Sequence, residues 1–150
     1  MIRQNVITSW TAGLDDLAKI SREVAEHLLK AKAEPFVLWL SGDLGAGKTT
    51  FAKDLLYALG VPRNVPVLSP TYTYMTEYES TNGLLAHMDL YRLVDGDTDS
   101  VEMLLSGRVF RGLIIEWPER ARHSSLIEKT FVLHFAILGD DERRQIEFYK

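Results

Sequence analysis

A glycine-rich stretch of eight residues has the composition and spacing of a phosphate-binding loop. It follows the pattern G-x-x-x-x-G-K-[ST] and consists of Gly42, Asp43, Leu44, Gly45, Ala46, Gly47, Lys48 and Thr49. Successive backbone N–H groups that open into a helix N-terminus offer donors and a positive dipole end to phosphate oxygens. In such a loop the lysine reaches the β- and γ-phosphates, and the threonine hydroxyl binds Mg²⁺. The alternative is a glycine-rich turn between a strand and a helix, with no ligand.

The segments on either side of this loop suit phosphate chemistry. The apolar run from Phe36 to Ser41 lacks polar alternation, so it predicts a short strand that is covered on both faces. Thr50 to Leu59 predicts a helix, which Gly60 and Pro62 then end. Strand, glycine loop and helix is the order in which a P-loop is built.

Two carboxylates follow apolar runs later in the chain. Asp89 ends the run from Leu84 to Met88, and Glu116 ends the run from Leu113 to Ile115. A nucleotide-hydrolysing site needs a carboxylate near Mg²⁺ and a group that orients the attacking water. Either acid could coordinate the metal or polarise the water. For Asp89 the alternative is a cap on the turn that follows.

Three further side chains each have a structural alternative. Thr71, in the Ser-Pro-Thr stretch at residues 69–71, could offer its hydroxyl to Mg²⁺ or to the γ-phosphate, or simply lead into a strand. His87 lies two residues before the first acid and so faces the same side of a strand. A packed, hydrogen-bonded histidine is favoured there over a catalytic one. Trp117 follows the second acid and could contact a ligand or pack in the core.

The remaining pattern predicts helices interleaved with buried strands. Helices are expected at Leu14–Lys30 and Ser100–Ser106, with a helical turn at Glu119–Ser124. A further strand is expected at Ile2–Trp10. A hairpin is expected over Thr71–Asp89, with its turn at Asn82-Gly83. Two final strands are expected at Phe131–Leu138 and Gln145–Phe148, joined by the turn Gly139–Arg144. The order indicates an α/β fold, a single P-loop NTPase-like domain whose central, mostly parallel sheet is flanked by helices and has antiparallel hairpins at its edge.

Composition excludes several classes of protein. The chain has 150 residues, enough for one domain with a real core and short for two. It has no cysteine, which excludes disulfides and cysteine-based zinc or redox chemistry. The net charge of −4 argues against a whole-protein electrostatic nucleic-acid binder. Without a signal-peptide core or a long apolar run, we expect a cytoplasmic protein that does not enter a membrane.

Four motifs, in this order and spacing, resemble the TsaE (YjeE) family. They are GDLGAGKTTF at residues 42–51, SPTYT at 69–73, HMDLYRL at 87–93 and IEWP at 115–118. The closing turn with Gly139, Arg143 and Arg144 is also similar to that family. The family consists of small bacterial P-loop ATPases. They serve the pathway that places threonylcarbamoyl on adenosine 37 of tRNAs that read ANN codons.

The resemblance implies ATP and Mg²⁺ as cofactors and gives each site residue a role. Nucleotide contacts fall to the eight loop residues together with Thr50 and Trp117. The implied catalytic residues are Glu116, Thr71 in a switch-like position, and Lys48. The implied metal ligands are Thr49, Asp89 and Glu116. Which of the two acids binds the metal and which prepares the water stays open.

The resemblance also implies partners. They are TsaD, the transferase, and TsaB, its partner subunit. The resemblance implies that this protein uses ATP to reset the TsaB–TsaD complex between rounds. It also implies that the protein contacts tRNA only indirectly or through that complex. Weak turnover is expected from the isolated protein. The segment Asp95–Arg111 departs from the longer helix and loop that the family often has there. Two alternative functions are a small-molecule P-loop kinase with an arginine-rich lid and a nucleotide-gated binding module without useful catalysis.

Overall fold

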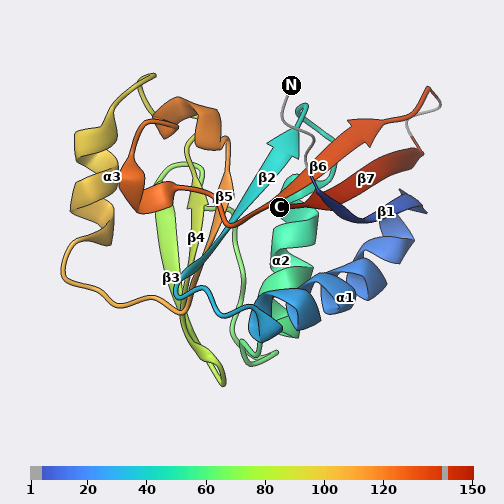
Figure 1. Ribbon diagram of the computed structural model, residues 1–150, viewed down its shortest axis with the longest axis horizontal. Coiled ribbons are helices and arrows are strands. Elements are labelled where there is room, and N and C mark those ends of the chain that lie inside the picture. The colour runs from blue at the N-terminus through green and yellow to red at the C-terminus, as the bar shows by residue number, and fades with distance from the viewer. Residues whose placement is uncertain (1–4, 140–141) are drawn as a thin grey trace.

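Seven strands form one mixed sheet in the computed structural model, which describes residues 5–139 and 142–150. Their order across the sheet is β1-β7-β6-β2-β5-β4-β3 (Figure 1). The strands are β1 (Val6–Gly13), β2 (Phe36–Gly42), β3 (Met75–Ser80), β4 (Gly83–Asp89), β5 (Gly112–Glu116), β6 (Phe131–Ile137) and β7 (Arg143–Tyr149). The helices are α1 (Leu17–Lys30), α2 (Lys48–Ala58) and α3 (Thr98–Leu105), with 3₁₀ turns at Leu14–Asp16, Pro118–Ala121 and Ser125–Ile127.

Parallel pairing occupies the centre of the sheet. β2 pairs in parallel with both β5 and β6, and β5 pairs in parallel with β4. The flanks are antiparallel, with β3 beside β4 on one side and β7 and β1 following β6 on the other. The predicted α/β fold is confirmed as a mixed sheet with a parallel core, and the antiparallel hairpins extend it at both edges.

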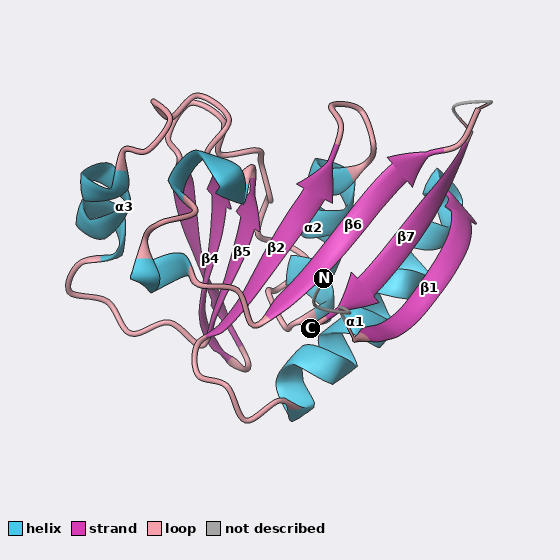
Figure 2. Ribbon diagram, turned by 45° about the horizontal axis from the view of Figure 1, so that its top comes forward, coloured by secondary structure: helices cyan, strands magenta, loops and turns pink. Residues whose placement is uncertain are grey.

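Both faces of the central strands are covered. Leu38 and Leu40 of β2 are buried in a core with α1 and α2, whereas Val37 packs on the opposite face with Val101 of α3. In the turned view, α1 and α2 lie together on one side of the sheet, well apart from α3 (Figure 2). This double cover explains why β2 is apolar at successive positions rather than at alternate ones.

β1 runs to Gly13, three residues beyond its predicted end at Trp10, and the helical turn predicted at Glu119–Ser124 is a 3₁₀ turn over Pro118–Ala121. Two further boundaries differ from the sequence prediction for local reasons. α1 begins three residues late, at Leu17, because Asp16 accepts a hydrogen bond from Gly13 N (2.9 Å) and a 3₁₀ turn forms first. β3 begins at Met75 because Tyr74, with a left-handed backbone at φ 66°, closes a turn where a strand was predicted. Elements β2, α2, β4, α3, β5, β6 and β7 agree with prediction to within two residues.

Parts of two predicted segments lie outside the described residues, namely the start of the Ile2–Trp10 strand and the centre of the Gly139–Arg144 turn. Within the described ranges, no helix is both long and apolar enough to cross a membrane.

Candidate active site

A cavity of about 420 Å³ lies where β4 and β5 end and α2 begins. Its walls are Leu14, Leu44, Gly45, Gly47, Lys48, Thr49, Thr50, Thr71, Asp89, Tyr91, Glu116, Trp117 and Arg144. Every predicted catalytic or metal-ligating residue is therefore brought together. Of the predicted nucleotide contacts, Gly42, Asp43 and Ala46 belong to the loop but do not line the cavity. This carboxyl-terminal edge of parallel strands is where open α/β sheets bind ligands.

The glycine loop requires glycine at its two ends. Gly42 has φ 136°, and a Cβ there would lie 2.3 Å from the carbonyl oxygen of Phe135 on β6. Gly47 caps α2 with φ 102°, and its carbonyl accepts the bond from Phe51 N (2.9 Å). Only glycine adopts these conformations readily, and the loop can therefore turn directly from β2 into the helix.

Lys48 points into the cavity and is 5% exposed. Its Nζ donates to the carbonyl oxygen of Gly42 and lies 3.7 Å from the centroid of the Trp117 ring. Trp117 has a left-handed backbone (φ 57°) just beyond the end of β5, and Tyr91 packs against its ring with centroids 5.0 Å apart. A cation held over an aromatic face in this way is favourably placed. Trp117 thus lines the cavity and also packs, partly buried, against the core cluster on the α3 side of the sheet.

Strand register places the two acids side by side. Asp89 at the end of β4 pairs with Glu116 at the end of β5, in the parallel register. Because side chains alternate along a strand, His87, Asp89 and Glu116 all face the side of the sheet that α2 covers. Asp89 is 5% exposed and Glu116 is 2% exposed.

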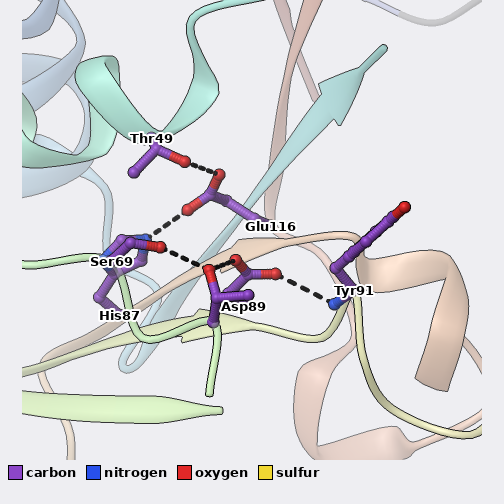
Figure 3. Close-up of polar contacts among 7 residues, drawn as sticks. Thr49, Ser69, His87, Asp89, Tyr91 and Glu116 are labelled. Carbon is purple, nitrogen blue, oxygen red and sulfur yellow. Dashed lines mark hydrogen bonds and ion pairs between the residues drawn. The ribbon is translucent and has the colours of Figure 1, made fainter. Parts of the chain in front are cut away.

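Glu116 joins the P-loop to the interior of the sheet (Figure 3). Thr49 Oγ1 donates to Glu116 Oε1 at 2.7 Å, and the other carboxylate oxygen, Oε2, lies 2.7 Å from His87 Nε2. His87 is 1% exposed, so it is a packed and hydrogen-bonded histidine, as favoured from the sequence. It is nevertheless in direct contact with the acid, and it fixes the carboxylate orientation.

Asp89 holds the loop that precedes β3 (Figure 3). Thr71 Oγ1 donates to Asp89 Oδ2 at 2.9 Å, and Ser69 Oγ lies 2.7 Å from the same threonine hydroxyl. Tyr91 N donates to Asp89 Oδ1 at 3.0 Å. Asp89 therefore caps the following turn, which was the structural alternative, and also anchors Thr71 at the cavity wall.

Sequence reasoning missed Arg144 as a member of the site and considered this residue only as part of the closing turn. Arg144 is 6% exposed, and it shares the inward face of β7 with the buried Ile146 and Phe148. Its guanidinium donates to the carbonyl oxygens of Ala46 and Gly45, at 3.2 Å each. The signal was present in the sequence, because an arginine in phase with the apolar residues of an alternating strand points inward.

Comparison with known proteins identifies the family of the chain. The model of the TsaE family, described as threonylcarbamoyl adenosine biosynthesis protein TsaE, matches residues 14–146. The tRNA threonylcarbamoyladenosine biosynthesis protein TsaE of Aquifex aeolicus (strain VF5) is 38% identical over 136 residues, 91% of this chain and 90% of that protein. The protein of the same name from Bacillus subtilis (strain 168) is 39% identical over 110 residues, 71% of this chain and 65% of that protein.

A solved structure is similar over almost the whole chain. The crystal structure of Bacillus subtilis YdiB superposes with a TM-score of 0.67 at 29% identity, covering 99% of this chain and 87% of that one. The resemblance inferred from the four motifs is thereby confirmed. The chain belongs to the TsaE family of threonylcarbamoyl adenosine biosynthesis proteins.

Proposed function

We propose that this protein is a Mg²⁺-dependent ATPase required for the threonylcarbamoyl modification of adenosine 37 in tRNAs that read ANN codons. It acts with the TsaB–TsaD complex and resets that complex between turnovers. The observation that carries the ATPase proposal is the 2.7 Å hydrogen bond between Thr49 of the P-loop and Glu116 of β5. It supports the proposal because the P-loop threonine hydroxyl and an acid lie together at one end of the cavity. The names of the relatives support the pathway.

The residues present fit a magnesium ion that arrives with its nucleotide. Among the described residues, no group of three or more histidine, aspartate or glutamate side chains could hold a metal ion by itself. Mg²⁺ typically keeps several waters and takes only one or two protein ligands beside the phosphates. The Thr49 hydroxyl and the Glu116 carboxylate are hard oxygen ligands of the kind it prefers. When bound, the ion offsets negative charge on the phosphate oxygens.

The chain's own residues then position the reacting groups. Lys48 exchanges its contact with the Gly42 carbonyl for the β- and γ-phosphates. Glu116, whose orientation is fixed by His87, lies on the metal side and accepts a hydrogen bond from the attacking water. Asp89 acts through Thr71, whose hydroxyl it directs toward the γ-phosphate side of the cavity. Because phosphoryl transfer depends mainly on positioning and electrostatics, these fixed groups support slow hydrolysis by the isolated protein.

The mouth of the cavity explains why a partner would be needed. Three apolar or aromatic side chains of the wall are open to solvent: Leu14 is 52% exposed, Leu44 65% and Tyr91 39%. Water is therefore not excluded from the phosphates, and electrostatic stabilisation is weaker in such a wet site. A protein that covers these side chains would dry the site and speed hydrolysis.

The test is ATP turnover with and without TsaB and TsaD. We expect the isolated protein to turn over slowly and the complex to raise its rate by about tenfold or more, because the covered site excludes water. Multi-turnover threonylcarbamoylation of tRNA should also require the protein, whereas the first turnover should not. An unchanged ATPase rate on adding both partners would contradict the proposed coupling.

The kinase alternative receives no support from the site. Its arginine-rich lid would have to come from Asp95–Arg111, yet no residue of this segment, all of which is described, lines the cavity. With labelled ATP and a pool of metabolites, we expect label only in free phosphate.

Nucleotide affinity should weaken at alkaline pH because of Lys48. Burial lowers the pKa of Lys48 below its ordinary value of 10.5, although four carboxylates act to raise it: Glu116, Glu119, Asp89 and Asp43. The ammonium that attracts phosphate is present below the lowered pKa and is lost as the pH rises through it. We therefore expect the Kd for ATP to increase with pH before 10.5 is reached, as measured by calorimetry.

The matched control is Lys48→Arg, because a guanidinium stays protonated over this range. Its Kd, whatever its starting value, should remain level across the same pH interval. If the Kd of the natural protein stayed level up to pH 10.5, the predicted loss of affinity through deprotonation of Lys48 would be contradicted.

A further inference from the structure

We propose that Arg144 is a positioning residue of the nucleotide site, which clamps the tip of the glycine loop and adds a permanent positive charge beside the phosphates. This inference rests on the proposed nucleotide binding and goes beyond the roles assigned above to the P-loop lysine, the threonines and the two acids. It concerns a residue that is almost one hundred positions away from the loop it holds.

Strand pairing positions Arg144 beside the glycine loop. Near the start of β7, Arg144 pairs with Ala12 of β1 on one side and with Ile137 of β6 on the other. It is therefore supported by two neighbouring strands, and its side chain is 6% exposed. A long side chain held in this way has lost most of its rotational freedom before any ligand arrives, so its donors are preorganised.

The two hydrogen bonds restrain the tip of the loop, where the buried Ala46 packs in the core but Gly45 is exposed. Arg144 Nε donates to the Ala46 carbonyl and Nη2 donates to the Gly45 carbonyl, both at 3.2 Å. Gly45 has φ 79°, and a Cβ placed there would meet nothing within 4 Å, so no side-chain packing fixes this residue. A mobile glycine would have to be ordered on binding, at a cost in free energy.

The clamp also sets the direction of a phosphate-binding N–H group. In a trans peptide the C=O and N–H groups point in opposite directions. Holding the Ala46 carbonyl against Arg144 therefore turns the Gly47 N–H to the other side of the loop. The N–H of Ala46 itself already bonds to the Asp43 carbonyl at 3.2 Å. The loop is thus closed by its own turn and fixed from outside by one guanidinium.

Charge gives Arg144 a second role. The cavity walls carry two carboxylates, Asp89 and Glu116, and two cations, Lys48 and Arg144. Without Arg144 the acids would outnumber the remaining cation, and a triphosphate would enter a negative site. A guanidinium keeps its proton at any pH that a protein tolerates, so this contribution is constant.

The test compares Arg144→Met with Arg143→Met. Arg143 is the exposed neighbour on the same strand, so both variants lose one charge from nearly the same place. We expect Arg144→Met to raise the Kd for ADP about tenfold, which corresponds to about 1.4 kcal/mol. The Kd of Arg143→Met should stay within about twofold of the natural protein, because surface charges contribute little. Equal effects of the two substitutions would overturn the proposal.

A purely structural role is separated by rescue. In Arg144→Ala, guanidinium ion at low millimolar concentration should restore much of the lost ADP affinity, whereas sodium chloride at the same ionic strength should not. If Arg144 only supported the sheet, the melting temperature without nucleotide would fall while the folded variant bound ADP normally. That result would reject the clamp. Failure of the natural protein itself to bind ADP would instead reject the nucleotide function on which the clamp depends.

Discussion

Replacing Lys48 by alanine is expected to lower ATP turnover by about a hundredfold or more, the typical effect of losing a preorganised charge at a transition state. The ammonium is the cation that the P-loop itself aims into the cavity, and its contact with Gly42 keeps it at the phosphate end. The measurement is phosphate release in the presence of TsaB and TsaD, where we expect the highest rate.

The control for this substitution lies one turn further along α2. Lys53 is an exposed lysine of the same helix, so Lys53→Ala removes equal charge without touching the cavity. Its turnover should match that of the natural protein. Melting curves of both variants without nucleotide separate catalysis from folding. If Lys48→Ala kept near-normal turnover while folded, the glycine loop would be a structural turn and the ATPase proposal would fall.

Replacing Glu116 by glutamine should remove turnover, again by about a hundredfold or more, but leave nucleotide affinity nearly unchanged. The amide has the same shape and can still contact Thr49 and His87, which now lie 2.7 Å from the carboxylate oxygens. What it loses is the negative charge that, in the proposed mechanism, orients water and holds the metal. Phosphate release and ADP affinity should be measured on the same preparation, with the exposed Glu119→Gln as the matched control.

This variant also decides between hydrolysis and a nucleotide-gated module. If hydrolysis resets the partner complex, cells that carry Glu116→Gln should lose the tRNA modification as fully as cells that carry Lys48→Ala. If nucleotide binding alone is enough, Glu116→Gln should support normal modification while Lys48→Ala does not. Modified adenosine in total tRNA, quantified by mass spectrometry, gives the answer directly.

Local patterns were sufficient for much of the fold and for most of the site. β2, the glycine loop and α2 follow from composition and glycine spacing over about twenty neighbouring residues, because their geometry depends on few distant contacts. Glu116 could be predicted because an acid after a buried parallel strand must emerge at the ligand-binding edge. These features can therefore be predicted from short stretches of sequence.

Other features depend on which segments meet in space. Alternation along β7 predicts that Arg144 points inward, but its contact with the glycine loop requires β7 to lie between β6 and β1. β3 starts late because residues 71–73 form a turn instead of a strand. In that turn the Thr71 hydroxyl donates to Asp89, which lies at the end of the neighbouring strand β4. No periodicity within either segment encodes these contacts. They are set by strand order, which the linear pattern left undetermined.

The contact between Lys48 and Trp117 gives the protein a built-in optical probe. An indole's emission responds to the electric field of a nearby charge, and only 3.7 Å separates the ammonium from this ring. Trp39 donates to the Ile127 carbonyl and has the Lys129 ammonium farther away, at 5.7 Å from its ring centroid, and Trp10 packs against the core on the side of α1 and α2. If nucleotide binds as proposed and its phosphate draws the ammonium off the ring, one tryptophan of three changes its surroundings. We therefore expect nucleotide binding to change the fluorescence of the native chain, without any attached dye.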